Sequence, residues 1–176
     1  SAFYDCSILK SITIPDKVKT IGKSAFYDCI GLTNLTIPDG VETIGNDAFA
    51  QCSNLTTATI GKYVTSIGSG AFDWCTSLAS IEIPDSVTKI GYNAFEECKK
   101  LTTVNLGKGL TCIDDQTFNY CRALKEVIFT GNVKHIGNEA FGSCVSLESI
   151  TIPNGVQSIG EYTFSDCTSL SSIVLP

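Results

Sequence analysis

Hydrophobic residues recur along this chain with a period of 23 residues. A phenylalanine marks each repeat, and a cysteine and a leucine follow it after three and six residues. The series runs from Phe3, Cys6 and Leu9 to Phe164, Cys167 and Leu170. A fixed period in the twenties is typical of solenoids, in which each unit buries its apolar side only against its neighbours. We therefore expect one elongated domain of about eight coils over residues 1–176.

Each repeat combines two local patterns, as the unit at residues 25–47 illustrates. Apolar residues spaced by three at 26–32 predict a short helical turn that faces inward. Residues 35–37 alternate apolar and polar side chains, which predicts a half-buried strand. A Pro-Asp-Gly turn follows at 38–40. Gly45 closes the coil, and we expect it to adopt a positive φ, a conformation that glycine tolerates.

The composition excludes several classes of function. A net charge of −6 and a pI near 4.7 argue against nucleic acid and anionic membranes, which attract basic surfaces. No apolar run approaches the roughly 18 residues of a membrane span, and no signal peptide is present. The sequence opens inside a repeat and stops just after a strand pattern, without polar caps. We expect a fragment of a longer protein, so the missing signal is uninformative.

Eight of the nine cysteines share one repeat position and are expected to stack on successive coils. At a spacing of about 4.8 Å they are within reach of a disulfide, but their Cβ vectors run parallel. We expect reduced, buried, metal-free thiols that pack as small hydrophobic groups. Bridged or zinc-bound cysteines are the alternatives, although no C-x2-C pair occurs. Cys112 falls outside the series and is expected to be at least half exposed. No cofactor is expected.

The repeat pattern A-F-x-x-C-x-x-L-x-x-I-x-I-P-x-x-V-x-x-I-G resembles the BspA-type leucine-rich repeat over the whole chain. The resemblance implies an α/β repeat solenoid: a curved right-handed coil with a parallel concave sheet and short helical or irregular convex segments. Members are typically surface or secreted proteins of bacteria and parasitic protists, often linked to adhesion, matrix binding or coaggregation. The strands of the sheet are expected near residues 12–14, 34–37, 57–60, 80–83, 103–106, 126–129, 149–152 and 172–175.

Two columns of outward side chains are expected on this sheet. One runs Thr13, Thr36, Thr59, Glu82, Asn105, Ile128, Thr151, Val174, and its neighbour runs Ser11, Asn34, Thr57, Ser80, Thr103, Glu126, Ser149, Ser172. Threonine simply suits a solvated strand face, which is one interpretation. The other is a binding face, because the columns depart from Thr and Ser in the middle repeats. The candidate partner-binding residues are Glu82, Asn105, Glu126 and Ile128.

Further candidates lie on the opposite, convex side. Trp74 and Tyr120 occupy one repeat position two coils apart, where they either anchor a partner or shield the convex turns. Lys99 and Arg122 lie on neighbouring repeats, interleaved with glutamates, and suit a solvated mixed-charge face. His135 is the only histidine, and no positioned nucleophile accompanies it in the sequence. With its core positions filled, the domain is expected not to be an enzyme.

The expected function is an extracellular or cell-surface recognition or adhesion module that binds through the concave face. Its partner would be a protein or glycan, from a host matrix or another cell surface, with neither nucleic acid nor membrane insertion involved. The alternative is a passive spacer that displays other domains. A recognition face breaks the regularity of the repeat locally, whereas a spacer keeps it. We expect the protein to be surface-bound or secreted.

Overall fold

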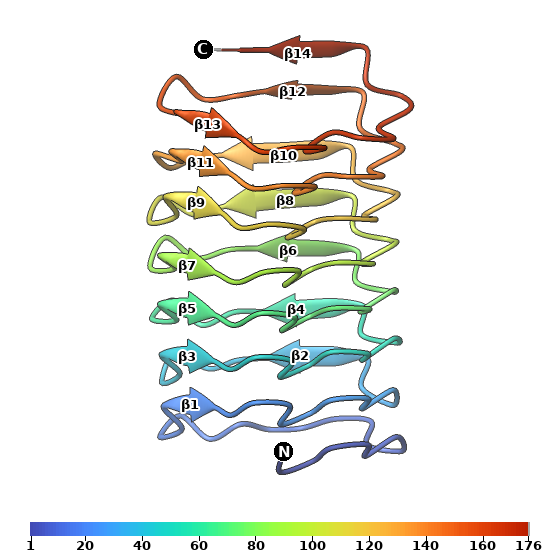
Figure 1. Cartoon of the computed structure of the whole chain (residues 1–176). Coiled ribbons are helices and arrows are strands. Elements are labelled where there is room, and N and C mark those ends of the chain that lie inside the picture. The colour runs from blue at the N-terminus through green and yellow to red at the C-terminus, as the bar shows by residue number, and fades with distance from the viewer. Residues whose placement is uncertain (176) are drawn as a thin grey trace.

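The computed structural model describes residues 1–175, which form a stack of parallel coils (Figure 1). Most coils contribute one longer strand and one two-residue strand. The longer strands are β2 (Asn34–Thr36), β4 (Thr57–Thr59), β6 (Ser80–Glu82), β8 (Thr103–Leu106), β10 (Glu126–Phe129), β12 (Ser149–Thr151) and β14 (Ser172–Val174). The short strands are β1 (Thr20–Ile21), β3 (Thr43–Ile44), β5 (Ser66–Ile67), β7 (Lys89–Ile90), β9 (Cys112–Ile113), β11 (His135–Ile136) and β13 (Ser158–Ile159).

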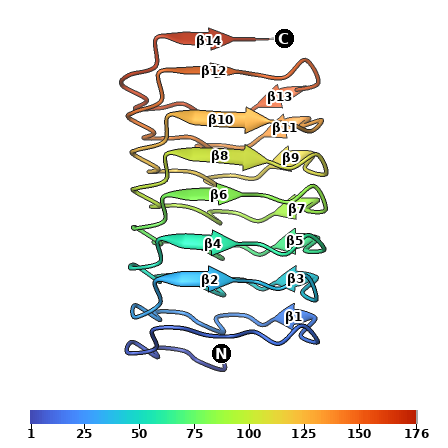
Figure 2. The same cartoon turned by 180° about the vertical axis from the view of Figure 1, so that it is seen from behind.

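The strands pair in parallel with a register of one repeat. The longer strands form a five-stranded sheet from β2 to β10 and a two-stranded sheet of β12 and β14. The short strands form sheets of four (β1, β3, β5, β7) and three (β9, β11, β13). Glu82 on β6, for example, lies opposite Asn105 on β8. Seen from both sides, the long and short strands occupy separate columns along the stack (Figures 1 and 2).

The expected longer strands are confirmed to within a residue at every coil except the first. Residues 12–14 lie outside the strands, although Ile12 and Ile14 remain half-buried. An end position alone does not account for this, because β14 also has a single neighbour, β12, and forms a strand. The short-strand ladder was not predicted from the sequence, because two-residue strands leave too little alternation to distinguish them from turns.

The expected helical turns are wrong: no helix occurs within residues 1–175. The amides of Phe26 and Asp28 donate instead to the next coil, to the carbonyls of Ala48 and Ala50, both at 2.8 Å. Amides used across coils are not free for i→i−4 bonds. Asp28 also has a φ of 56°, which turns the chain out of a helical path. We call this side of the coil, residues 24–32 and their equivalents, the turn face.

The expected positive φ at Gly45 is also wrong, because Gly70 is the one glycine within the described residues that has a positive φ. Glycine is needed at the Gly45 position for space. A Cβ on Gly68 would lie 2.5 Å from the backbone nitrogen of Asn46, and one on Gly91 would lie 2.6 Å from that of Ser69. Gly22, in the first coil, has nothing within 4 Å of its would-be Cβ. Glycine recurs at this position because successive coils approach too closely there to leave room for a Cβ.

Asp114 replaces glycine in this column, and the short-strand ladder is interrupted at that coil. Strand β7 ends the four-stranded sheet, and β9, which directly precedes Asp114, begins the three-stranded one. The amides of Gly91 and Gly137 donate to the carbonyls of Ile67 and Ile113 at 2.9 and 2.8 Å. Residue 114 is the one position of this column within the described residues that carries a Cβ, and the interruption coincides with it.

The interior is filled by side chains that stack along the coil axis. The Phe rings lie nearly parallel, with centroids 5.0 Å apart at Phe3–Phe26 and 5.7 Å apart at Phe141–Phe164. Beside them, each cysteine of the repeat series from the second coil onward lies within hydrogen-bonding distance of the Phe carbonyl of the preceding coil. Cys98 Sγ, for example, donates to the Phe72 carbonyl at 3.3 Å. The thiols are unbridged, and this contact to backbone gives them a polar partner that the sequence pattern did not reveal.

Gly68→Ala tests the close approach of the coils. The added methyl group must displace the Asn46 backbone, so we expect unfolding free energy to fall by about 1–3 kcal/mol. Gly22→Ala is the matched control, because the same substitution in the first coil meets open space and is expected to change stability by less than about 1 kcal/mol. Urea denaturation of both variants measures the difference. Equal effects would contradict the packing role of this column.

Candidate functional site

The longer strands bring three of the four candidate residues together. Glu82, Asn105 and Ile128 lie in register on the neighbouring strands β6, β8 and β10. Glu126 lies on β10 in the adjacent column, opposite Thr103. Glu82, Glu126 and Ile128 are exposed, and Asn105 is half-buried. Glu82, Asn105 and Ile128 therefore form one continuous row across three strands, and the Glu126 carboxylate flanks this row.

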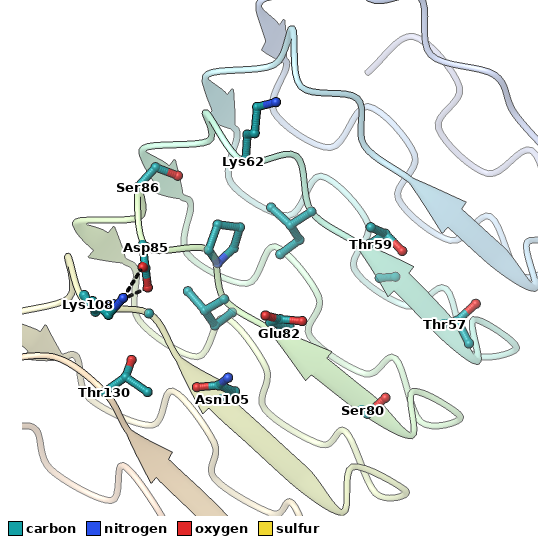
Figure 3. A pocket seen from close by; sticks show the side chains of 15 residues that line it. Thr57, Thr59, Lys62, Ser80, Glu82, Asp85, Ser86, Asn105, Lys108 and Thr130 are labelled. Atoms are coloured by element: carbon teal, nitrogen blue, oxygen red, sulfur yellow. Dashed lines mark hydrogen bonds and ion pairs between the residues drawn. The ribbon is translucent and has the colours of Figure 1, made fainter.

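A shallow groove of about 860 Å³ lies at one end of this row (Figure 3). Glu82 and Asn105 line it, together with Ile83, Pro84 and Thr130. Glu126 and Ile128 are not among its lining residues. The Asn105 Oδ1 atom is buried without a hydrogen-bond partner, next to the Glu82 strand. A buried acceptor without a partner costs free energy unless water or a ligand donates a hydrogen bond to it. Asn105 Oδ1 is therefore the acceptor in this groove that a ligand could satisfy.

Two ion pairs of the same design lie beside the groove. In each, an aspartate of the turn after one strand accepts from the backbone amide and the ammonium of the lysine one repeat later. The Lys108 ammonium lies 2.9 Å from Asp85 (Figure 3), and the Lys62 ammonium lies 2.9 Å from Asp39. The hydrogen bonds from Lys108 hold the pKa of Asp85 below its ordinary value, and those from Lys62 do the same for Asp39. These exposed pairs link successive turns along the rim of the groove.

The turn face carries a carboxylate cluster that the sequence patterns did not single out. Asp73, Glu96 and Asn119 hold the position after the phenylalanine on three successive coils. Asn119 is buried and donates its Nδ2 to Glu96 Oε1 at 3.1 Å. Burial, followed by the nearby charge of Glu96, raises the pKa of Asp73 to about 7. Burial likewise raises the pKa of Glu96. The sequence did contain a signal for this cluster: Asp73 and Glu96 are one repeat apart, and residues at the same repeat position lie next to each other on successive coils.

His135 lies between two candidate nucleophiles on the short-strand ladder. In the pairing of β9, β11 and β13 it is opposite both Cys112 and Ser158. Its Nδ1 is 2.9 Å from Ser158 Oγ. Burial raises the pKa of the Cys112 thiol to about 11, and Cys112 donates to Asp114 Oδ1 at 3.4 Å. A thiol of raised pKa is the reverse of an activated nucleophile.

Residues 1–175 offer neither a metal site nor a membrane-spanning helix. No three His, Cys, Asp or Glu side chains converge there in a way that would hold a metal ion. The same residues contain no helix that could cross a bilayer.

Asp73→Asn tests the carboxylate cluster. A raised pKa means that the folded chain holds the Asp73 proton more tightly than the unfolded chain, so wild-type stability falls as pH rises from about 4 to about 7. Asparagine cannot ionise, so the variant is expected to be more stable than wild type at pH 8, by the order of 1–2 kcal/mol. The two should converge near pH 4. Urea denaturation at both pH values measures this, with Glu82→Gln as an exposed control. A variant less stable at pH 8 would contradict the assignment.

Comparison with known proteins agrees with the geometry. The family profile described as the BspA type leucine-rich repeat region, six copies, matches residues 1–124 and 88–176. A search of curated proteins finds no match. A T. pallidum leucine-rich repeat protein is 27% identical, with a TM-score of 0.59 over 82% of this chain and 79% of its own. A leucine-rich cell surface protein from Faecalibacterium prausnitzii is 25% identical, with a TM-score of 0.51 over 98% and 74%.

The fold extends to more distant proteins. The pneumococcal vaccine antigen PcpA is 22% identical, with a TM-score of 0.59 over 89% of this chain and 48% of its own, which is a likeness of fold. Two overlapping profile matches span every repeat, and the observed coils have the expected register of 23 residues. The chain therefore belongs to the family of BspA-type leucine-rich repeat proteins.

Proposed function

We propose that this chain is a recognition module of a surface-bound or secreted protein, which binds a protein partner through the sheet of longer strands. Families of this type are surface proteins that often mediate protein binding, and one similar structure is that of a cell surface protein. The observation that carries the proposal is the in-register row Glu82, Asn105 and Ile128. A strand face that only needs to stay solvated gains nothing from replacing threonine there by a carboxylate, an amide and an aliphatic side chain.

The three side chains of the row offer different interactions to a partner. Ile128 is 38% exposed and supplies apolar area, while Glu82 and the unpaired Asn105 Oδ1 supply acceptors. An apolar group beside satisfied polar contacts is the usual composition of an interface core. The face carries no histidine or activated thiol, and the family is typically non-enzymatic, so we propose binding without catalysis.

A passive spacer is the second candidate function. The unbroken 23-residue register supports this function, because a regular stack of coils holds its two ends at a fixed separation. The two functions differ in whether the surface of the middle coils engages a partner at all.

A binding screen against matrix proteins and glycans tests the proposal. The wild-type chain is compared with a variant in which Glu82, Asn105, Glu126 and Ile128 are all alanine. We expect wild-type binding to a protein and a loss of at least about tenfold in the variant, as for removal of interface anchors. The matched control replaces Thr36, Asn34, Thr151 and Ser149, which hold the same columns on β2 and β12, by alanine.

The outcomes separate the candidates. If the variant with all four alanine substitutions still binds the partner, the binding site lies elsewhere on the solenoid. A folded chain that binds nothing in the screen would favour the spacer.

A further inference from the structure

Two exposed aromatic rings stand on the turn face, away from the sheet of longer strands. Trp74 and Tyr120 hold the same repeat position, two coils apart, and their exposed fractions are 45% and 37%. Glu97 holds this position on the coil between them. At about 4.8 Å per coil the two rings repeat at roughly 10 Å along the stack.

The backbone at these two residues is unsuited to aromatic side chains. Both Trp74 and Tyr120 have a φ of 57°, in the left-handed region. The other coils place Asp, Gln, Glu or Ser at this position, again with positive φ. Polar residues, Asp above all, tolerate this region better than bulky ones do. Part of each residue is buried, yet 45% of Trp74 and 37% of Tyr120 stay exposed, and large exposed aromatic side chains on a left-handed backbone point to a role in binding.

Charged neighbours hold the two rings in place. The Lys99 ammonium lies 4.8 Å from the centre of the Trp74 ring and 3.2 Å from Glu97 Oε2. The Arg122 guanidinium lies 5.7 Å from the centre of the Tyr120 ring. Cation–π contacts of this kind restrict the side-chain torsions of the rings. The surface is thereby preorganised, which lowers the entropy cost of binding a ligand.

Polar groups of the carboxylate cluster adjoin both rings. Asp73 directly precedes Trp74, and Asn119 directly precedes Tyr120. Glu96, between them, is fixed by Asn119 at 3.1 Å. The Oδ1 atom of Asp73 has no hydrogen-bond partner. Asp73 Oδ1 and Asn119 are buried, so a ligand that lies along the two rings would meet the partly exposed carboxylates of Glu96 and Glu97 beside an apolar surface.

We propose that Trp74 and Tyr120 form a binding site for a neutral β-1,4-linked polysaccharide that runs along the solenoid axis. Sugar rings present C–H groups with partial positive charge, which pack on the negative faces of aromatic rings, and hydroxyl groups, which bind carboxylates and amides. In a β-1,4-linked chain each sugar is turned over relative to the last, so equivalent faces recur at every second sugar. That disaccharide repeat matches the spacing of the two rings.

Charge and geometry favour a neutral sugar chain over a polyanion. Lys99 is already paired with Glu97, and Glu96, on the coil between the rings, adds a partly exposed carboxylate, so an anionic polymer would meet negative charge as well as Arg122. An α-1,4-linked glucan curls and does not present sugars in line at a two-coil spacing. This site is separate from the sheet of longer strands, so it stands or falls independently of the function proposed for that sheet.

The single tryptophan makes the site directly observable. Trp74 is the one tryptophan of the chain, so its fluorescence reports on this position alone. We expect the Trp74 fluorescence to change saturably when cellohexaose or chitohexaose is added, and to stay unchanged when maltohexaose is added. Tyr120→Ala keeps the reporter and is expected to weaken binding of the same probe about tenfold or more, as for an interface anchor.

Tyr63→Ala is the matched control. Tyr63 is also exposed, at 59%, and also carries a cation, with the Lys62 ammonium 5.2 Å from its ring centre, but it lies away from the turn face in the loop after β4. We expect this variant to bind like wild type. Calorimetric titration extends the test to Trp74→Ala, which has no reporter, and circular dichroism checks the fold of each variant.

Three results would overturn the proposal. The first is the absence of binding to both β-linked hexasaccharides at millimolar concentration. The second is binding that Tyr120→Ala leaves unchanged. The third is binding only to a sulfated polymer, abolished by salt, which would assign the surface to a polyanion instead.

Discussion

The structure depends on one constraint, which is that backbone groups on one coil pair with those about one repeat away on the next. The pairing joins the longer strands, the short strands and alternate amides of the turn face, so most coils are held to a neighbour at three places around their perimeter. An insertion in any coil would break all three. The glycine column adds a steric condition, since the coils approach too closely for a Cβ at positions such as Gly68.

This constraint explains where function can reside. The interior is occupied at each level by Phe, Leu, Ile, Val and Cys, which leaves the outward positions as the variable part of the repeat. Side chains at one repeat position become neighbours in space, so a substitution on two or three successive coils creates a surface feature. The row on the longer strands and the ring pair on the turn face are both of this kind. Each occupies the middle coils, where neighbours on both sides support the backbone.

The sequence predicted the parts of the fold that follow from burial. Hydrophobic spacing located the longer strands and the stacked phenylalanines, because a phenylalanine, a cysteine and a leucine recur at the same positions of every repeat. It failed where backbone pairing decides the conformation: the spacing at 26–32 suggested a helical turn, yet the Phe26 and Asp28 amides bond to the next coil. It also misjudged Gly45, where the distance to a neighbouring coil matters and φ does not. The row at Glu82 was visible as a break in a column, whereas the raised pKa of Asp73 depends on burial that only the packed coils show.

Native-state hydrogen exchange tests the pairing of the coils most directly. The amides of Phe49, Phe72 and Phe95 donate across coils at 2.8, 2.8 and 2.9 Å and should exchange slowly and at similar free energies. The Asp114 amide lies where the short-strand ladder is interrupted and should exchange faster than those of Gly91 and Gly137. Phenylalanine amides that exchanged as in an unfolded chain, or an Asp114 amide as protected as those of the two glycines, would contradict pairing between the coils as the basis of the fold.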